Sequence, residues 1–295
     1  MRNILLTFLL FISIISTIKA QSIQEDSSKI KFEFLPKGLH FIPLRANIDE
    51  AKMGVLMYPK DWHLKVDIGN TVDVFKLSFA DNVFSVGAEF MAFAYVTSYQ
   101  QYRLQIDEID GFFGGNLTYT KNFSKGQLFS RFRIIHNSSH LADGHWDWST
   151  HAWKDNKIPY AFGRDYAEIA LGHILPTEKI LFRYYGSASY AFHQNAGGKP
   201  LKRTMFGIGA EISSPKFIGR ILNNDTNVFL AGQVNFKGIP KYVGDQNYML
   251  GFKFGDWNGK GILIYASYYT GGDLFNQYFT DRVSRFGFGF AFEFI

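Results

Sequence analysis

The sequence predicts an all-β fold, a closed antiparallel transmembrane β-barrel of about twelve strands. The first observation lies at the end of the chain, where every second residue from Phe286 to Phe294 is phenylalanine and the residues between are glycine, alanine or glutamate. This period of two is that of a β-strand, whose side chains alternate between two faces. In water such an aromatic face would promote aggregation. In a bilayer it contacts lipid, and the small or charged face lines the lumen.

The second observation is that similar alternation recurs along most of the chain, in segments separated by turn signals. The first of these segments, 62–79, could also be two strands. If this segment is one strand, the chain has twelve predicted strands, and an even number of strands is typical of single-chain bacterial barrels. The segments are 62–79, 83–95, 101–108, 112–123, 127–139, 161–173, 179–193, 201–213, 226–237, 248–256, 261–269 and 282–295.

The third observation is an export signal at the start of the chain. Arg2 precedes an apolar run from Ile4 to Ile15, and a short polar exit ends at Ala20. This pattern predicts a signal peptide over 1–20, because the run is too short for a spanning helix. The predicted organisation is then a signal peptide (1–20), an N-terminal segment that forms a latch or partial plug (21–61), and the barrel (62–295).

Composition narrows the possible functions. The chain has no cysteine, so an exported protein of this kind does not depend on disulfides. The formal net charge of +5 falls to +3 without Arg2 and Lys19 of the signal, which is too small to indicate a nucleic-acid partner. No segment after the signal is long and apolar enough to predict a transmembrane helix.

Two stretches resemble known families. The strand that contains Gly289, Phe292 and Phe294 resembles the C-terminal signal of bacterial outer-membrane proteins, although the chain here continues to Ile295. The run from Phe41 to Ala46 resembles the N-terminal stretch of an uncharacterised family of exported bacterial proteins. Together they imply a barrel in the outer membrane of a Gram-negative bacterium. The alternative is that the final stretch is a core strand of a soluble β-sandwich.

Loop lengths predict an orientation for the barrel, because outer-membrane barrels have short periplasmic turns and longer outer loops. The longest connection, 140–160, is then an outer loop, as are 194–200, 238–247 and 270–281. The connections 124–126, 174–178 and 257–260 are periplasmic. The connection 214–225 is longer than a periplasmic turn is expected to be.

His136 and Ser138 form a candidate catalytic pair. Arg131 and Arg133 must face the lumen, since a charge on the lipid face is costly, so His136 and Ser138 share the outward parity of Phe132. A serine two residues from a histidine on one strand face can be activated by it as a general base. The pair resembles the active site of outer-membrane phospholipase A, and more loosely that of lipid A deacylase. The resemblance implies Ser138 as nucleophile and His136 as base; proximity gives Glu168 or Asp165 on the next strand as the orienting group.

Metal binding is the second hypothesis for this region. His140, Asp143 and His145 supply nitrogen and oxygen donors within a short stretch of the same loop. The third interpretation is a solvated loop whose tryptophans lie at the level of the lipid headgroups. No cofactor is expected, apart from calcium if the protein is a phospholipase.

The sequence therefore favours an integral outer-membrane barrel that is non-catalytic and binds lipid or a protein partner as an accessory component. Its expected partners are outer-membrane lipids, either phospholipid or lipopolysaccharide, or a protein of the same membrane, but no nucleic acid. The alternatives are a lipid-ester hydrolase acting through Ser138 and His136, and a narrow channel.

Overall fold

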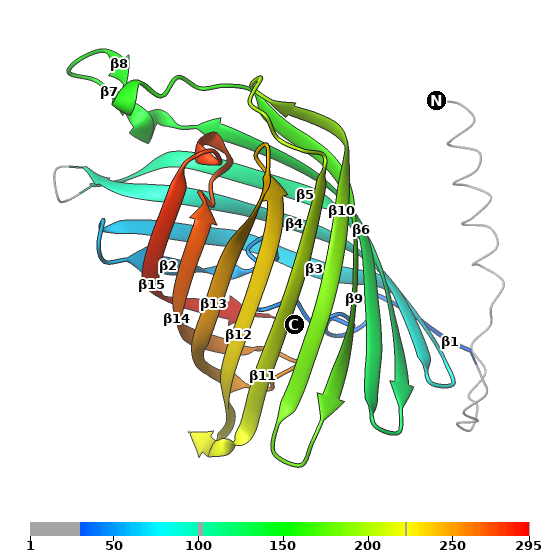
Figure 1. Ribbon diagram of the computed structural model, residues 1–295. Helices are drawn as coiled ribbons and strands as arrows, with labels where there is room; N and C mark the ends of the chain where they lie inside the picture. The colour runs from blue at the N-terminus through cyan, green and yellow to red at the C-terminus, as the bar shows by residue number, and fades with distance from the viewer. Residues whose placement is uncertain (1–29, 100–102, 222, 295) are drawn as a thin grey trace.

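The computed structural model describes residues 30–99, 103–221 and 223–294, so the predicted signal peptide lies outside the described residues. Among these residues one sheet contains thirteen strands, and it closes into a barrel because its first wall strand, β2, pairs with its last, β15 (Figure 1). Apart from β1 (Lys31–Phe34), which pairs beside β3, the wall consists of twelve antiparallel strands. They are β2 (Met53–Tyr58), β3 (His63–Phe79), β4 (Asn82–Tyr99), β5 (Arg103–Phe123), β6 (Gly126–Leu141), β9 (Phe162–Pro176), β10 (Leu181–Ala196), β11 (Thr204–Ile221), β12 (Asn224–Gly238), β13 (Tyr242–Gly255), β14 (Gly261–Gly272) and β15 (Arg282–Glu293).

The closed antiparallel barrel is confirmed, but two of the predicted strand assignments are wrong. Segments 101–108 and 112–123 belong to one long strand, β5. The wall begins with β2, at Met53, inside the segment predicted to precede the barrel and not at residue 62. The first error adds a strand and the second omits one, so the predicted total of twelve wall strands is still correct. The connections 214–225 and 238–247 are shorter than predicted, because β11, β12 and β13 extend into them.

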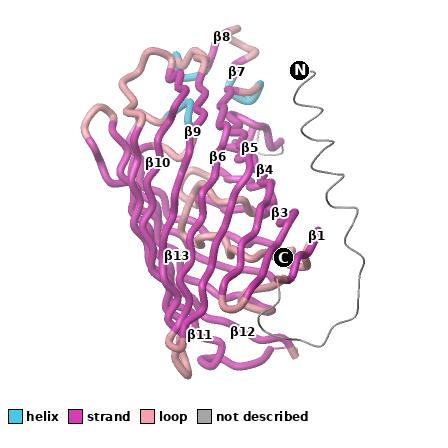
Figure 2. The backbone as a smooth tube through the Cα atoms, turned by 90° about the vertical axis from the view of Figure 1, so that its right-hand side faces the viewer, coloured by secondary structure: helices cyan, strands magenta, loops and turns pink. Residues whose placement is uncertain are grey.

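Short elements occupy the connections at one end of the barrel, which we call the loop end. The connection between β6 and β9 carries a small hairpin of β7 and β8, seen at the top of Figures 1 and 2. Among the described residues, no helix is long and apolar enough to cross a membrane. The elements are η1 (Asp143–His145), β7 (Trp146–Asp147), β8 (Ala152–Trp153), η2 (Lys154–Asn156) and η3 (Asn276–Tyr278).

The two faces of the wall differ in polarity. Along β6 the side chains of Arg131 and Arg133 are buried in the lumen, whereas Phe132 and Ile134 are exposed on the outside, as their parity predicts. The phenylalanines of β15 are likewise exposed, from Phe286 to Phe294. An apolar outer face around a polar, charged interior is stable when hydrocarbon surrounds the wall. This arrangement supports an integral membrane barrel and excludes the β-sandwich alternative.

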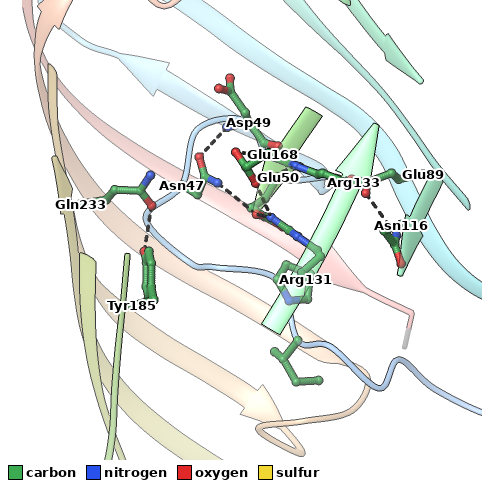
Figure 3. A network of polar contacts seen from close by, with 12 residues as sticks. Asn47, Asp49, Glu50, Glu89, Asn116, Arg131, Arg133, Glu168, Tyr185 and Gln233 are labelled. Carbon is green, nitrogen blue, oxygen red and sulfur yellow. Dashed lines mark hydrogen bonds and ion pairs between the residues drawn. The ribbon is translucent and has the colours of Figure 1, made fainter. Parts of the chain in front are cut away.

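The chain between β1 and β2 enters the barrel and fills much of its lumen; we call residues 36–52 the plug. Glu50 of the plug accepts two hydrogen bonds from Arg131, at 2.8 and 2.5 Å, and one from Asn47 at 3.0 Å (Figure 3). Arg133 donates to the carbonyl oxygen of Asp49 at 3.0 Å. A cavity of about 50 Å³ between the plug and the wall has room for only a few water molecules.

Wall residues at other heights also hold the plug. Arg183 donates to the carbonyl oxygens of Ile42 (2.6 Å) and Pro43 (3.2 Å). Arg45 forms an ion pair with Glu293 of β15, and its amide donates to Glu211 at 2.7 Å. The plug thus contacts strands on several sides of the lumen.

The connection between β14 and β15 folds over the lumen at the loop end; we call residues 273–281 the cap. Phe275 and Gln277 are buried, and the backbone N–H of Gln277 donates to the carboxylate of Glu108 in β5 at 3.1 Å. Asp273 accepts hydrogen bonds from Arg285 at 3.0 and 2.8 Å. Burial raises the pKa of Asp273, although the Arg285 guanidinium opposes the shift. The plug and the cap therefore close the lumen in series.

The β2–β15 seam should tolerate no side chain at Gly54. A Cβ there would lie 2.3 Å from the carbonyl oxygen of Phe290, whereas a Cβ at Gly186 of β10 would be no closer than 3.8 Å to its neighbours. We expect Gly54→Ala to lower the free energy of unfolding by about 1–3 kcal/mol through overpacking. The measurement is the urea midpoint of the refolded barrel, followed by its heat-modifiable mobility on gels, and this midpoint should fall. Gly186→Ala is the matched control, and equal midpoints for the two variants would contradict a tight seam.

Candidate functional site

The candidate site lies on the outer face of β6, near the loop end. His136 and Ser138 are both partly exposed, while Asn137 and Ser139 between and beyond them are buried in the lumen. Two residues further from the loop end, Ile134 is half exposed. The pair thus lies at the upper border of the apolar outer face, on the side that the sequence predicts.

A carboxylate on the neighbouring strand orients His136. In the register of β6 and β9, His136 is directly opposite Asp165, and its Nδ1 lies 2.6 Å from Asp165 Oδ1. The other carboxylate oxygen lies 3.1 Å from Nδ1 of His193 on β10. On the other side, the ring of Phe113 lies 4.8 Å from that of His136, centroid to centroid. Phe113 and Asp165 therefore hold the imidazole from both sides, and two histidines share one carboxylate.

Ser138 stands in open space between two glycines. Its cross-strand neighbours are Gly111 of β5 and Gly163 of β9. A Cβ at either glycine would have no neighbour closer than 3.8 Å, so nothing covers the hydroxyl from the sides. Among the described residues, no hydrogen bond joins Ser138 to His136. A bound substrate can supply the alignment that is absent here, because catalytic hydrogen bonds often tighten only in the complex.

This arrangement has the parts of a general-base site. A carboxylate that accepts the Nδ1 proton leaves Nε2 as the basic nitrogen and stabilises the imidazolium that forms when it takes a proton. Ser138, the candidate nucleophile, lies on the same face of the same strand. The glycines leave room for an acyl group beside it.

Glu168, one of the two predicted candidates for the orienting group, has no contact with His136 among the described residues. It faces the lumen, where its carboxylate lies 2.8 and 3.1 Å from the guanidinium of Arg133. Asp165 and Glu168 are an odd number of positions apart, so they lie on opposite faces of β9. Asp165, the other candidate, occupies the orienting position. The sequence does contain a signal that distinguishes them. Asp165 has the same parity along the strand as the exposed Ile169 and Leu171, whereas Glu168 has the opposite parity.

The structure does not bring His140, Asp143 and His145 together. His140 and Asp143 are exposed, whereas His145 is buried, with Nδ1 2.7 Å from Asp107 and Nε2 2.9 Å from the carbonyl oxygen of Lys154. Across the described residues, no group of three or more acidic or histidine side chains is placed to hold a metal ion. Both nitrogens of His145 are therefore engaged, Nδ1 with Asp107 of the wall strand β5 and Nε2 with Lys154 of the same loop.

Sequence reasoning missed His193 as part of the site. A β-bulge between Ala191 and His193 shifts the register of β10 against β9. As a result His193 lies opposite Asp165 on the outer face, although simple alternation places it in the lumen. No feature of the sequence marks this bulge.

Comparisons with known proteins give a family and two distant structural similarities. Residues 62–294 match the family described as "Protein of unknown function (DUF1207)". A search of curated proteins gave no match. Among solved structures, the β domain of the Bordetella autotransporter BrkA has 11% identity and a TM-score of 0.42 over 83% of this chain and 100% of that one. A bacterial polysaccharide outer membrane secretin has 10% identity and a TM-score of 0.33 over 84% and 100% of the two chains.

Proposed function

The chain belongs to the DUF1207 family, and from this premise we propose that it is an integral protein of the bacterial outer membrane that binds a lipid on the outside of its wall. The observation that carries the proposal is the cluster of His136, Asp165 and His193 on the outward face. A polar cluster at the border of an apolar face meets the headgroup of a lipid whose chains cover that face. The plug and cap fill the lumen, so the narrow-channel alternative has no supporting observation among the described residues.

Binding is tested with a variant that removes the polar cluster while keeping its bulk. In His136→Leu/His193→Leu we expect the lipid retained by the protein to fall several-fold, because the charge-assisted hydrogen bonds to the headgroup are lost. The measurement is native mass spectrometry of protein taken from liposomes of phospholipid or lipopolysaccharide. His173→Leu is the control, since His173 is on β9 near its opposite end and hydrogen-bonded to Tyr184. Equal retention by the two variants would contradict the proposal.

Ester hydrolysis is the second candidate, and the 2.6 Å contact of His136 with Asp165 favours it. In this reaction Ser138 Oγ attacks the carbonyl carbon of an acyl ester, and its proton passes to Nε2 of His136. The proton is then given to the departing alcohol as the ester bond breaks, leaving an acyl-serine. Water, deprotonated by the same histidine, releases the fatty acid and restores Ser138.

Ser138→Ala is expected to abolish fatty-acid release from such liposomes, and Asp165→Asn to lower it by a factor of about 10²–10⁴, because the imidazole loses its orienting charge. The matched control is Ser139→Ala, since Ser139 is the next residue but faces the lumen and donates to Glu108 at 2.5 Å. Lipid retention without fatty-acid release, with or without added calcium, would leave binding as the function and exclude hydrolysis.

A further inference from the structure

The His136–Asp165–His193 cluster continues sideways into a row of basic side chains. Lys202 precedes β11, and its ammonium lies 4.5 Å from the centre of the Tyr242 ring on the outer face. Arg203 beside it donates to the carbonyl oxygens of Ala191 and Phe192, at 3.0 and 2.8 Å, which lie at the β10 bulge. Lys241 is exposed in the turn between β12 and β13. We call these three residues, together with His193, the basic row.

Strand pairing places the basic row at one height. Thr204 pairs with Tyr190, so Lys202 stands beside the bulge that carries His193. The backbone amide of Lys202 donates to the carbonyl oxygen of Gly238 at 2.8 Å, which joins it to the strand before Lys241. Among the described residues, Asp165 is the acidic side chain within ion-pair distance of the row, through His193, and it is already shared by two histidines. The row therefore presents an excess of positive charge.

The wall immediately below the His136–Asp165–His193 cluster and the row is apolar and exposed from β6 to β13. Its side chains point outward and are between 36% and 53% exposed; they are Ile134, Ile169, Tyr190, Phe206, Phe236 and Tyr242. Phe206 and Tyr242 are in contact, with ring centroids 5.9 Å apart. A charged row above an apolar floor matches an anionic headgroup above hydrocarbon chains.

The combined width of the His136–Asp165–His193 cluster and the basic row indicates what kind of lipid they fit. From His136 on β6, through His193 on β10, to the end of β12 there are four strand spacings, or about 19 Å at roughly 4.8 Å each. This is wider than a two-chain phospholipid, and the apolar floor below it has room for several chains side by side. We propose that the basic row binds the phosphate groups of a phosphorylated glycolipid with several acyl chains. This inference rests on the proposed lipid binding and names the class of lipid.

The test compares three lipids on one protein: lipid A, dephosphorylated lipid A and phosphatidylglycerol. Retention is measured by native mass spectrometry in the Ser138→Ala background, so that hydrolysis cannot affect the result. We expect lipid A to be retained about ten-fold more than either of the others, because charge-assisted bonds to phosphate are strong. Lys202→Ala/Lys241→Ala should remove this preference, and Lys179→Ala/Lys260→Ala, at the opposite end of the barrel, should preserve it.

The outcomes separate this inference from the function it rests on. Retention of all three lipids to the same extent would overturn the phosphate site and leave lipid binding intact. Stronger retention of phosphatidylglycerol would overturn the multi-chain glycolipid. Retention of none of them would overturn lipid binding itself. If the double lysine variant keeps the preference for lipid A, the basic row is not the phosphate site.

Discussion

Removing the plug and the cap together is expected to turn a non-conducting barrel into an ion-conducting pore. Residues 36–52 occupy the lumen between β1 and β2, and residues 273–281 cover its loop end. A lumen wide enough to hold a chain segment leaves room for hydrated ions once that segment is gone. Because the two closures lie in series, each single variant should conduct far less than the combination.

Strand pairing determines the length of the linker that replaces the plug and the turn that replaces the cap. Phe34 pairs with Phe75 and Gly54 with Asp67, so a linker must span eight residues of β3, or about 26 Å. About nine glycine and serine residues cover that distance. Gly272 pairs with Arg282, so an Asn-Gly turn can replace the cap. Conductance is measured in planar bilayers on protein that shows folded gel mobility. A conducting wild-type barrel, or a silent folded double variant, would contradict two closures in series.

The second large effect is expected at the plug–wall ion pair. Arg131→Met leaves Glu50 buried without its cation, and we expect a loss of about 3–5 kcal/mol in the free energy of unfolding. The double variant Arg131→Met/Glu50→Gln removes both charges, so it should recover most of this loss. Both are measured by urea unfolding of the refolded barrel.

The control for these Arg131 and Glu50 variants is a partly exposed ion pair. Lys76 and Glu33 lie 3.1 Å apart and retain about a quarter of their side-chain exposure. Removing Lys76 should cost at most about 1 kcal/mol, since such pairs contribute little. If the Arg131→Met loss is no larger, or if the double variant is as unstable as the single one, Glu50 and Arg131 are not coupled as the contacts indicate.

The parity of charged residues predicted the faces of β6 correctly. Once Arg131 and Arg133 are assigned to the lumen, His136 and Ser138 must lie outside, and they do. The partner of His136 could not be chosen in the same way, because it depends on the register between β6 and β9. A long connection with its own hairpin separates these strands, so nothing local in the sequence determines which residues become neighbours.

Strand β2 was missed because it has no alternation to detect. Its inward residues include Leu56 and Tyr58, which pack in the core, and its outward residues Met53, Val55 and Met57 are also apolar. Pro59 directly afterwards and Gly54 near its start both indicate irregular structure. In contrast, the bulge in β5 made one strand look like two, since an extra residue interrupts the period of two.

The tethering of the plug couples the filling of the lumen to the closing of the ring. β1 and β2 both pair with β3, so the plug is a loop held at its two ends by one strand of the wall. The β2–β15 pairing completes the ring, and β15 carries Glu293, which contacts Arg45 of the plug and Lys253 of the wall. The closing strand thus makes both of its ion pairs at Glu293 only when the plug is in the lumen. A ring that closed without the plug would leave the Glu293 carboxylate without Arg45. The β2–β15 pairing is therefore more stable in a barrel that contains the plug than in one that does not.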